Sequence, residues 1–249
     1  MPMTHTMKGV CFMGKRVRTY MKKWKAVILF MIIIKGVLLF YVVLKAGQEK
    51  GILGVSNNEV YADSEQKKIA LTFDDGPHPF YTEQLLDGLK ERGVVVTFFV
   101  TGEHADLHPD IIKRMQEEGH LIGNHTYSHI QLRQGNRQEF EEELRLTSQV
   151  IEEITGAETL YVRPPYGSWD KSLEKELNMI PVLWTVDPLD WCSDDVGSIV
   201  RRVTGIVDEN DIILMHDYFA TSVTAALQIV DELLAQGYSF VTVEELLFE

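Results

Sequence analysis

The chain has 249 residues, enough for one large domain or two small ones, and its formal net charge is −13. Seven of its 24 basic residues lie within residues 1–25 and none of its 37 acidic residues does, so the rest of the chain carries a net charge of −20. Because phosphate binding needs a basic face, this acidic body argues against nucleic acid as a partner.

The basic segment runs directly into residues 26–44, an apolar stretch interrupted only by Lys35 and Gly36. A helix of this length nearly crosses a hydrocarbon core of about 30 Å. Lys35 costs about 2.5–3.5 kcal/mol on insertion scales, which the surrounding Ile, Val, Leu and Phe residues can offset. A buried core helix is one alternative. A cleaved signal peptide is another, although the nearest small-residue pattern, at 60–62, lies far beyond the apolar stretch.

These patterns predict a single-pass protein of the cell membrane. Because positively charged flanks stay in the cytoplasm, the acidic body is expected to be extracellular. Cys11 and Cys192 then lie in different compartments, so no disulfide is expected, and Cys192 is interpreted as a small buried residue. The predicted parts are a basic cytoplasmic segment (1–25), a transmembrane signal-anchor (26–44), a linker (45–66) and a domain (67–249).

Strand and helix patterns alternate along residues 67–249. β-Branched and apolar runs predict strands at 68–73, 94–100, 120–123, 160–162, 180–185, 211–215 and 239–243. Helical spacing of apolar residues and terminal signals such as proline or glycine predict helices at 81–92, 109–118, 137–155, 169–178, 195–207 and 222–235. This alternation implies an α/β fold with parallel strands. About seven such units suit a compact (β/α) barrel, and a doubly wound open sheet fits the pattern almost as well.

The positions of the polar residues bear on this choice. Clusters at 74–75, 125–129, 163, 187–190 and 216–217 each follow a predicted strand. In a barrel the loops after the strands converge on one face, whereas in an open sheet they spread along an edge.

Asp74 and Asp75 are adjacent carboxylates, which repel each other unless their roles differ. One natural division is that one binds a metal while the other accepts a proton. His125 and His129 are spaced i and i+4, so on a helical turn they share a face and can bind one ion. With Asp75 they make a two-histidine, one-carboxylate set that leaves positions open for water and substrate. Two solvated or capping histidines are the alternative.

Three further residues stand at strand ends. Arg163 lies between a strand and two prolines, a place that favours an arginine aimed at a carboxylate over one in solvent. Trp191 beside Asp190 suits a sugar-binding platform, with a core tryptophan as the alternative. His216 ends an apolar strand, and a neighbouring carboxylate would raise its pKa and favour a proton donor.

Five segments in order resemble the motifs of the polysaccharide deacetylases, the NodB-homology enzymes of carbohydrate esterase family 4. The resemblance spans about residues 67–245, and every motif residue needed is present. The segments are Thr-Phe-Asp-Asp-Gly (72–76), His-Thr-Tyr-Ser-His (125–129), Arg-Pro-Pro-Tyr (163–166), Asp-Pro-Leu-Asp-Trp (187–191) and Ile-Leu-Met-His-Asp (213–217).

This resemblance implies a distorted (β/α) barrel and the metal-assisted removal of acetyl groups from an N-acetylated sugar polymer. The ion is expected to be zinc, with cobalt or nickel also accepted by such a site. The implied roles are Asp75, His125 and His129 as metal ligands, Asp74 as general base, His216 as acid, Asp190 and Arg163 as the residues that hold His216 and Asp74, the Tyr166 backbone N–H as oxyanion donor, and Trp191 and Leu214 as the lining of the acetyl pocket.

A membrane anchor would keep the enzyme beside the cell wall, so peptidoglycan is the expected polymer, with chitooligosaccharides and acetylxylan as alternatives. A carbohydrate-binding wall protein without turnover is the alternative from another class. A metal-dependent hydrolase of phosphate esters is disfavoured because no basic cluster accompanies the motifs.

Overall fold

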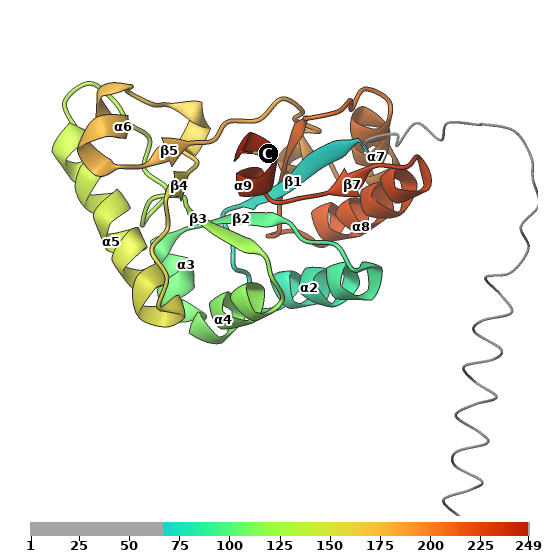
Figure 1. Ribbon diagram of the computed structural model, residues 1–249, viewed down its shortest axis with the longest axis horizontal. Helices are drawn as coiled ribbons and strands as arrows, with labels where there is room; N and C mark the ends of the chain where they lie inside the picture. Colours follow the sequence, from blue (N-terminus) through green and yellow to red (C-terminus); the bar gives the residue numbers. More distant parts are fainter. Residues whose placement is uncertain (1–66, 249) are drawn as a thin grey trace, which may run out of the picture. The chain divides into compact units, whose positions relative to one another are not determined.

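The structure, a computed structural model, describes residues 67–248, which form an α/β unit (Figure 1). The strands are β1 (Lys68–Asp74), β2 (Thr97–Val100), β3 (Leu121–Asn124), β4 (Tyr161–Val162), β5 (Ile180–Pro181), β6 (Ile212–His216) and β7 (Ser239–Phe240). The helices are α2 (Tyr81–Arg92), α3 (Gly102–Leu107), α4 (Pro109–Glu117), α5 (Arg137–Thr155), α6 (Ser172–Leu177), α7 (Val196–Thr204), α8 (Ala220–Ala235) and α9 (Val243–Phe248), with 3₁₀ turns η1 (Pro165–Gly167) and η2 (Asp190–Cys192).

The predicted cytoplasmic segment (1–25), signal-anchor (26–44) and linker (45–66) lie outside the described residues. Between residues 67 and 248, no helix is both long enough and apolar enough to cross a membrane.

All strand pairs are parallel, as the alternating pattern predicts. The neighbours run β5-β4-β3-β2-β1-β6, and β7 pairs with the first two residues of β1. The chain after β5 then changes partner. The Val182 amide donates to Val162 of β4 (2.8 Å), whereas Val186 accepts from Leu214 of β6 (2.9 Å). Residues 182–186 therefore connect β4 with β6, the two sides of the strand order, by hydrogen bonds. Such a connection is expected of a barrel and not of an open sheet.

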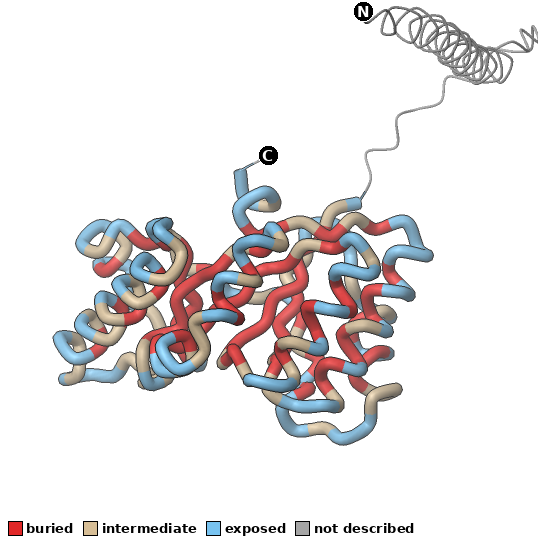
Figure 2. Tube along the Cα trace, turned by 90° about the horizontal axis from the view of Figure 1, so that it is seen from below, coloured by how far each residue is buried: buried red, intermediate tan, exposed pale blue. Residues whose placement is uncertain are grey.

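Side chains along β1 alternate between two apolar clusters. Ile69, Leu71 and Phe73 point outward into the cluster formed with the helices, which lie outside the strands in Figure 1. Ala70 points inward, where it meets side chains of other strands and of α9. In Figure 2 the buried residues follow the strands and the helix sides that face them. The inner cluster comprises Ala70, Phe99, Tyr161, Val182 and Val243, with Leu121, Leu160, Ile180, Ile212 and Leu246 packed against it.

Helices α2 and α8 approach closely at Gly88. A β-carbon on Gly88 would lie 2.5 Å from a methyl group of Leu227. Glycine at this position therefore lets the two helices come into direct contact.

Several predicted boundaries are wrong. The predicted strand 180–185 forms a ladder only at Ile180–Pro181, because the next residues move from one neighbour to the other. The predicted strand 239–243 ends at Phe240, and α9 begins at Val243. The short helix α3 was not predicted. Cys192 is free and exposed, not buried.

Candidate active site

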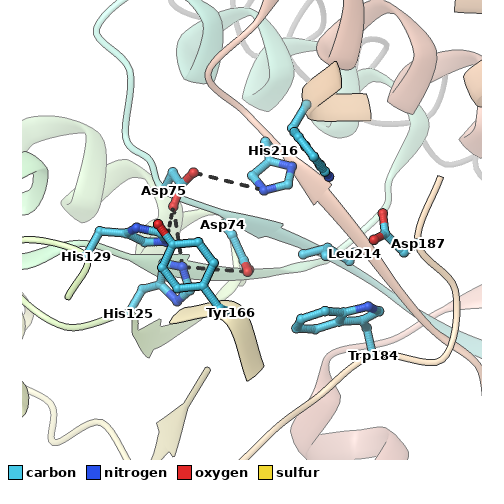
Figure 3. Close-up of a pocket in the computed structure, with 10 residues that line it drawn as sticks. Asp74, Asp75, His125, His129, Tyr166, Trp184, Asp187, Leu214 and His216 are labelled. Carbon is cyan, nitrogen blue, oxygen red and sulfur yellow. Dashed lines mark ion pairs between the residues drawn. The ribbon is translucent and has the colours of Figure 1, made fainter. Parts of the chain in front are cut away.

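The clustered polar residues converge at the carboxyl ends of the strands. Asp74 is the last residue of β1 and His216 the last of β6, and the two are direct partners in the parallel ladder. His125 directly follows β3, and Arg163 directly follows β4. Figure 3 shows His125 and His129 on one side of Asp74, with Leu214 and Trp184 on the other. This convergence is what the barrel arrangement predicts.

Asp75, His125 and His129 form a possible metal site. Nε2 of His125 lies 3.3 Å from Asp75 Oδ1, and Nε2 of His129 lies 3.4 Å from the same oxygen. Two ligands bound to one tetrahedral ion at about 2.0–2.1 Å lie roughly 3.3–3.4 Å apart. Asp75 Oδ1 is buried and has no hydrogen-bond partner among the described residues. The donor set and the spacing therefore fit a divalent cation.

Backbone contacts fix the orientation of His125. Its Nδ1 lies 2.6 Å from the Arg163 carbonyl oxygen. Because a carbonyl oxygen only accepts, Nδ1 carries the hydrogen, and Nε2 presents a lone pair toward Asp75 when the ring is neutral. Metal ligands of this kind are usually oriented through their second ring nitrogen.

Asp75 has a left-handed backbone (φ 74°), which is unusual for a residue other than glycine. The His104 ring supports this conformation, because its Nδ1 lies 2.7 Å from the Asp75 carbonyl oxygen and must donate to it. This contact could not be predicted from the sequence, because His104 lies on α3, far from Asp75 along the chain.

The charges around Asp75 shift its titration. Burial alone would raise the pKa of Asp75, but the nearby His125, His129 and His216 lower it to about 2. For His125, burial lowers the pKa, and the two adjacent aspartates outweigh this and raise it. Burial dominates for His129, whose pKa is lowered. Asp75 is therefore ionised at neutral pH, as a metal ligand needs to be.

Asp74 is paired with a buried arginine, Arg163. Arg163 is fully buried, and its Nη1 donates to Asp74 Oδ1 at 2.9 Å. Its Nε donates to the Val182 carbonyl at 3.1 Å, and its guanidinium lies 4.2 Å from the centre of the Phe99 ring. The second oxygen of Asp74 lies 3.7 Å from His125 Nε2. Asp74 is thus bonded to an arginine and lies near one imidazole, whereas Oδ1 of Asp75 faces two imidazoles.

Asp190 holds His216 through two contacts. Its Oδ1 lies 2.8 Å from His216 Nδ1, and its Oδ2 accepts from the His216 backbone amide at 2.8 Å. Burial would lower the pKa of His216, but Asp190 outweighs burial and raises the pKa to about 9. His216 is therefore protonated at neutral pH, with Nε2 facing Asp75 at 4.0 Å.

The adjacent carboxylate in the sequence, Asp217, has a different environment. It is fully buried and accepts a hydrogen bond from the Thr82 hydroxyl of α2. A β-carbon on Gly76 would lie 2.3 Å from its Oδ1, so glycine is required there. Burial raises the pKa of Asp217 to about 7. The carboxylate that raises the pKa of His216 is therefore principally Asp190.

A cavity of about 430 Å³ opens over these groups. Trp191 is 55% exposed, so the alternative of a core tryptophan is wrong. The Tyr166 ring lies 5.1 Å from that of His129. Trp184 and Asp187 also line the cavity, and neither was among the predicted site residues. The lining comprises Asp74, Asp75, His125, His129, Tyr166, Trp184, Asp187, Trp191, Leu214 and His216.

Residues 61–182 match the family model described as polysaccharide deacetylase. A peptidoglycan-N-acetylglucosamine deacetylase of Bacillus cereus is 39% identical over 201 residues, which cover 78% of this chain and 91% of that protein. The chain belongs to the polysaccharide deacetylase family. All ten predicted site residues of this deacetylase-family chain lie around one centre: eight line the cavity, and Arg163 and Asp190 contact two of them.

Other relatives differ in length and in stated substrate. The peptidoglycan-N-acetylmuramic acid deacetylase PdaC of Bacillus subtilis is 42% identical over 188 residues, which cover 76% of this chain and 40% of that protein. A solved structure of PdaC superposes with a TM-score of 0.71, covering 73% of this chain and 90% of that one. A chitooligosaccharide deacetylase of Rhizobium leguminosarum bv. trifolii is 39% identical, over 63% of this chain and 74% of that protein. The chain thus spans about 40% of the length of PdaC.

Proposed function

We propose that the chain is a membrane-anchored, metal-dependent deacetylase that hydrolyses N-acetyl groups of a cell-wall polysaccharide, with peptidoglycan as the polymer. The observation that carries this proposal is the division of the two adjacent carboxylates. Asp74 is paired with buried Arg163, and Asp75 faces the Nε2 atoms of two histidines. Family relatives named as deacetylases of N-acetylated sugars support the reaction class.

Asp75, His125 and His129 would hold the divalent cation, for which zinc is the first expectation and cobalt or nickel are alternatives. Such an ion polarises the amide carbonyl and lowers the pKa of water toward neutrality. The family resemblance implies the same three ligands, and the proximity of both histidine Nε2 atoms to one oxygen, Asp75 Oδ1, supports this assignment.

The proton transfers are assigned to Asp74 and His216, which are partners in the parallel ladder. Asp74 accepts a proton from the attacking water, and its bond to Arg163 Nη1 keeps one oxygen fixed while the other faces the site. His216 donates a proton to the leaving amine, and Asp190 keeps it charged for that step. The Tyr166 backbone N–H is assigned to the developing oxyanion.

Substrate binding is assigned to the apolar side of the cavity. Leu214 is almost fully buried, which suits contact with the acetyl methyl group. Trp191 and Trp184 offer aromatic faces to a sugar ring. The names of relatives include both N-acetylmuramic acid and N-acetylglucosamine. The sugar unit is therefore identified from the products of the reaction.

The assigned location is the cell membrane, with residues 26–44 as a single-pass anchor and the catalytic domain outside the cell. The support is the basic segment before the apolar stretch and the acidic character of the chain after it. Fractionation of cells followed by protease treatment of intact protoplasts tests this location. Degradation of the domain supports it, and a protected domain would contradict it.

The reaction is tested by mass spectrometry of peptidoglycan fragments and chitooligosaccharides after incubation with the full chain. We expect loss of acetyl groups, with acetate released and with activity abolished by a chelator. Asp74→Asn should lower acetate release by about 10²–10⁴-fold while the metal content stays at the wild-type level. Asp187→Asn, an acid that lines the same cavity, is the matched control. Sugar binding without acetate release by the wild type would instead indicate a carbohydrate-binding protein without turnover.

A further inference from the structure

The loop that carries His129 has an unfavourable backbone conformation. Thr126 and His129 both have left-handed backbones, with φ of 63° and 57°, and neither residue is glycine. Residues with a β-carbon rarely adopt this conformation, and they keep it only where the surrounding structure holds them. The contacts that hold residues 125–129 therefore decide where the His129 ring lies.

The two histidines of the proposed metal site differ in how their rings are held. His125 is oriented through Nδ1, which donates to the Arg163 carbonyl oxygen. Within residues 67–248, the His129 ring makes one polar contact, through Nε2 to Asp75. Metal-binding histidines are usually oriented through their second ring nitrogen, a support that His129 lacks in this part of the chain. Its orientation therefore depends on the backbone that carries it.

The first half of the loop is held by several hydrogen bonds. Asn124 Oδ1 accepts from the Thr126 amide at 2.8 Å, and Asn124 Nδ2 donates to the Leu144 carbonyl of α5 at 2.7 Å. The carbonyls of Thr126 and Tyr127 accept from the first two amides of α3, each at 3.0 Å. None of these bonds lies beyond residue 127.

The second half of the loop is held by one side chain, Glu143 of α5. Its Oε2 accepts from the Ser128 amide at 2.6 Å, and its Oε1 accepts from the Ser128 hydroxyl at 2.9 Å. From residue 128 to residue 130, every hydrogen bond made within the described part of the chain goes to this carboxylate. Hydrogen bonds to a carboxylate are short and strong, and a two-point contact also fixes geometry.

We infer that Glu143 is a positioning residue, which fixes the backbone at Ser128 and thereby holds the His129 ring in place for the metal. Glu143 neither lines the cavity nor belongs to the ligand set. It acts on the ion only through Ser128 and the histidine that follows it. The inference rests on the proposed function, because the position of a ligand matters to the reaction only if the site holds a cation.

The experiment measures the Zn²⁺ affinity of the full chain by competition with a chromophoric chelator. Glu143→Ala removes both bonds to Ser128 and should weaken Zn²⁺ binding by about 10–100-fold, the range for residues that orient a metal ligand. Glu143→Gln removes the charge and keeps the contacts, because its amide oxygen accepts from the Ser128 N–H and its amide nitrogen donates to the hydroxyl. This variant should retain most of the affinity.

Glu142→Ala is the matched control, because it removes the adjacent glutamate of α5, whose partner is Arg145. It should leave the Zn²⁺ affinity unchanged. Hydrogen exchange of the metal-free chain gives a second readout. The Ser128 amide should exchange faster in Glu143→Ala than in the wild type or in Glu142→Ala, because the bond that protects it is lost.

Unchanged Zn²⁺ affinity in Glu143→Ala would overturn the inference. An equal loss in Glu143→Gln would also overturn it, because the charge and not the position would then matter. The urea midpoint of Glu143→Ala should match that of Glu142→Ala, and a much lower midpoint would assign Glu143 to general stability instead. If the wild type binds no Zn²⁺, the proposed metal site fails, and exchange at Ser128 still decides whether Glu143 holds the loop.

Discussion

The bond between Asp190 and His216 sets the pH above which the proposed acid loses its proton. Asp190 raises the pKa of His216 to about 9 against the effect of burial. Relative to an unperturbed histidine near 6.5, a rise of this size corresponds to about 3 kcal/mol in favour of the imidazolium. Asp190→Asn removes the charge and keeps the shape. We therefore expect the pKa of His216 in the variant to fall toward about 6.5 or below.

The expected loss of kcat at pH 8 follows from these two pKa values. At pH 8 a group with pKa 9 is about 0.9 protonated and one with pKa 6.5 about 0.03 protonated, so kcat should fall roughly 30-fold. A cation bound by Asp75 lowers the pKa of His216 in both proteins, so the difference between them is the quantity predicted. The basic limb of the kcat profile should move about 2.5 units toward lower pH.

The assay is acetate release from chitooligosaccharide between pH 6 and 10. Asp187→Asn, which changes an acid of the same cavity that His216 does not contact, should leave the limb in place. The same pair contributes to stability. Because the folded pKa is raised, that contribution is complete below about pH 6.5 and disappears as pH rises through about 9. An unchanged basic limb in Asp190→Asn, with the fold intact by circular dichroism, would refute the assignment of His216 as the acid.

Three further predictions concern the groups around this pair. Arg163→Met leaves Asp74 buried without its partner and should cost about 3–5 kcal/mol in urea unfolding, whereas Arg145→Met at the surface should change little; equal effects would contradict the role of the buried pair. His125→Ala should abolish stoichiometric metal binding measured by inductively coupled plasma mass spectrometry, and His108→Ala should not; retained metal in the first variant would exclude this ligand set. Because the pKa of Asp217 is raised to about 7, this residue destabilises the fold progressively as pH rises from about 4 to 7. The free energy of unfolding of Asp217→Asn should therefore rise relative to that of the wild type, by up to about 4 kcal/mol between pH 4 and pH 8. A pH-independent difference would mean that the carboxylate is not neutral in the fold.

More of the site than of the backbone path could be predicted from the sequence. The residues 74–75, 125–129, 163 and 216 each follow a strand whose apolar pattern is clear, so their common face follows from parallel topology. Whether the sheet closes into a barrel could not be decided from the sequence, because closure depends on residues 182–186 changing from one neighbouring strand to another. No local pattern marks such a change, because the same apolar residues suit either ladder.

The residues that were missed act through tertiary contacts. Trp184 was read as part of an apolar strand, and its role in the cavity depends on that strand ending early. His104 lies on α3, whose six residues include a glycine and three polar side chains and give little helical periodicity. Its partner is a backbone carbonyl, and such an acceptor leaves no mark on the sequence. The left-handed backbone of Asp75 could have been a signal only if a glycine had stood there.

This left-handed residue explains why adjacent carboxylates can have different roles. In a continuing strand Asp74 and Asp75 would point to opposite faces of the sheet, one inward and one toward the helices. The turn at Asp75 instead brings its carboxylate over the mouth of the barrel, within 4.0 Å of His216 Nε2 and 3.3 Å of His125 Nε2. The hydrogen bond from His104 and the space left by Gly76 beside Asp217 stabilise that turn. The backbone conformation at this one residue, more than the charge of the pair, therefore divides the proposed base from the proposed metal ligand.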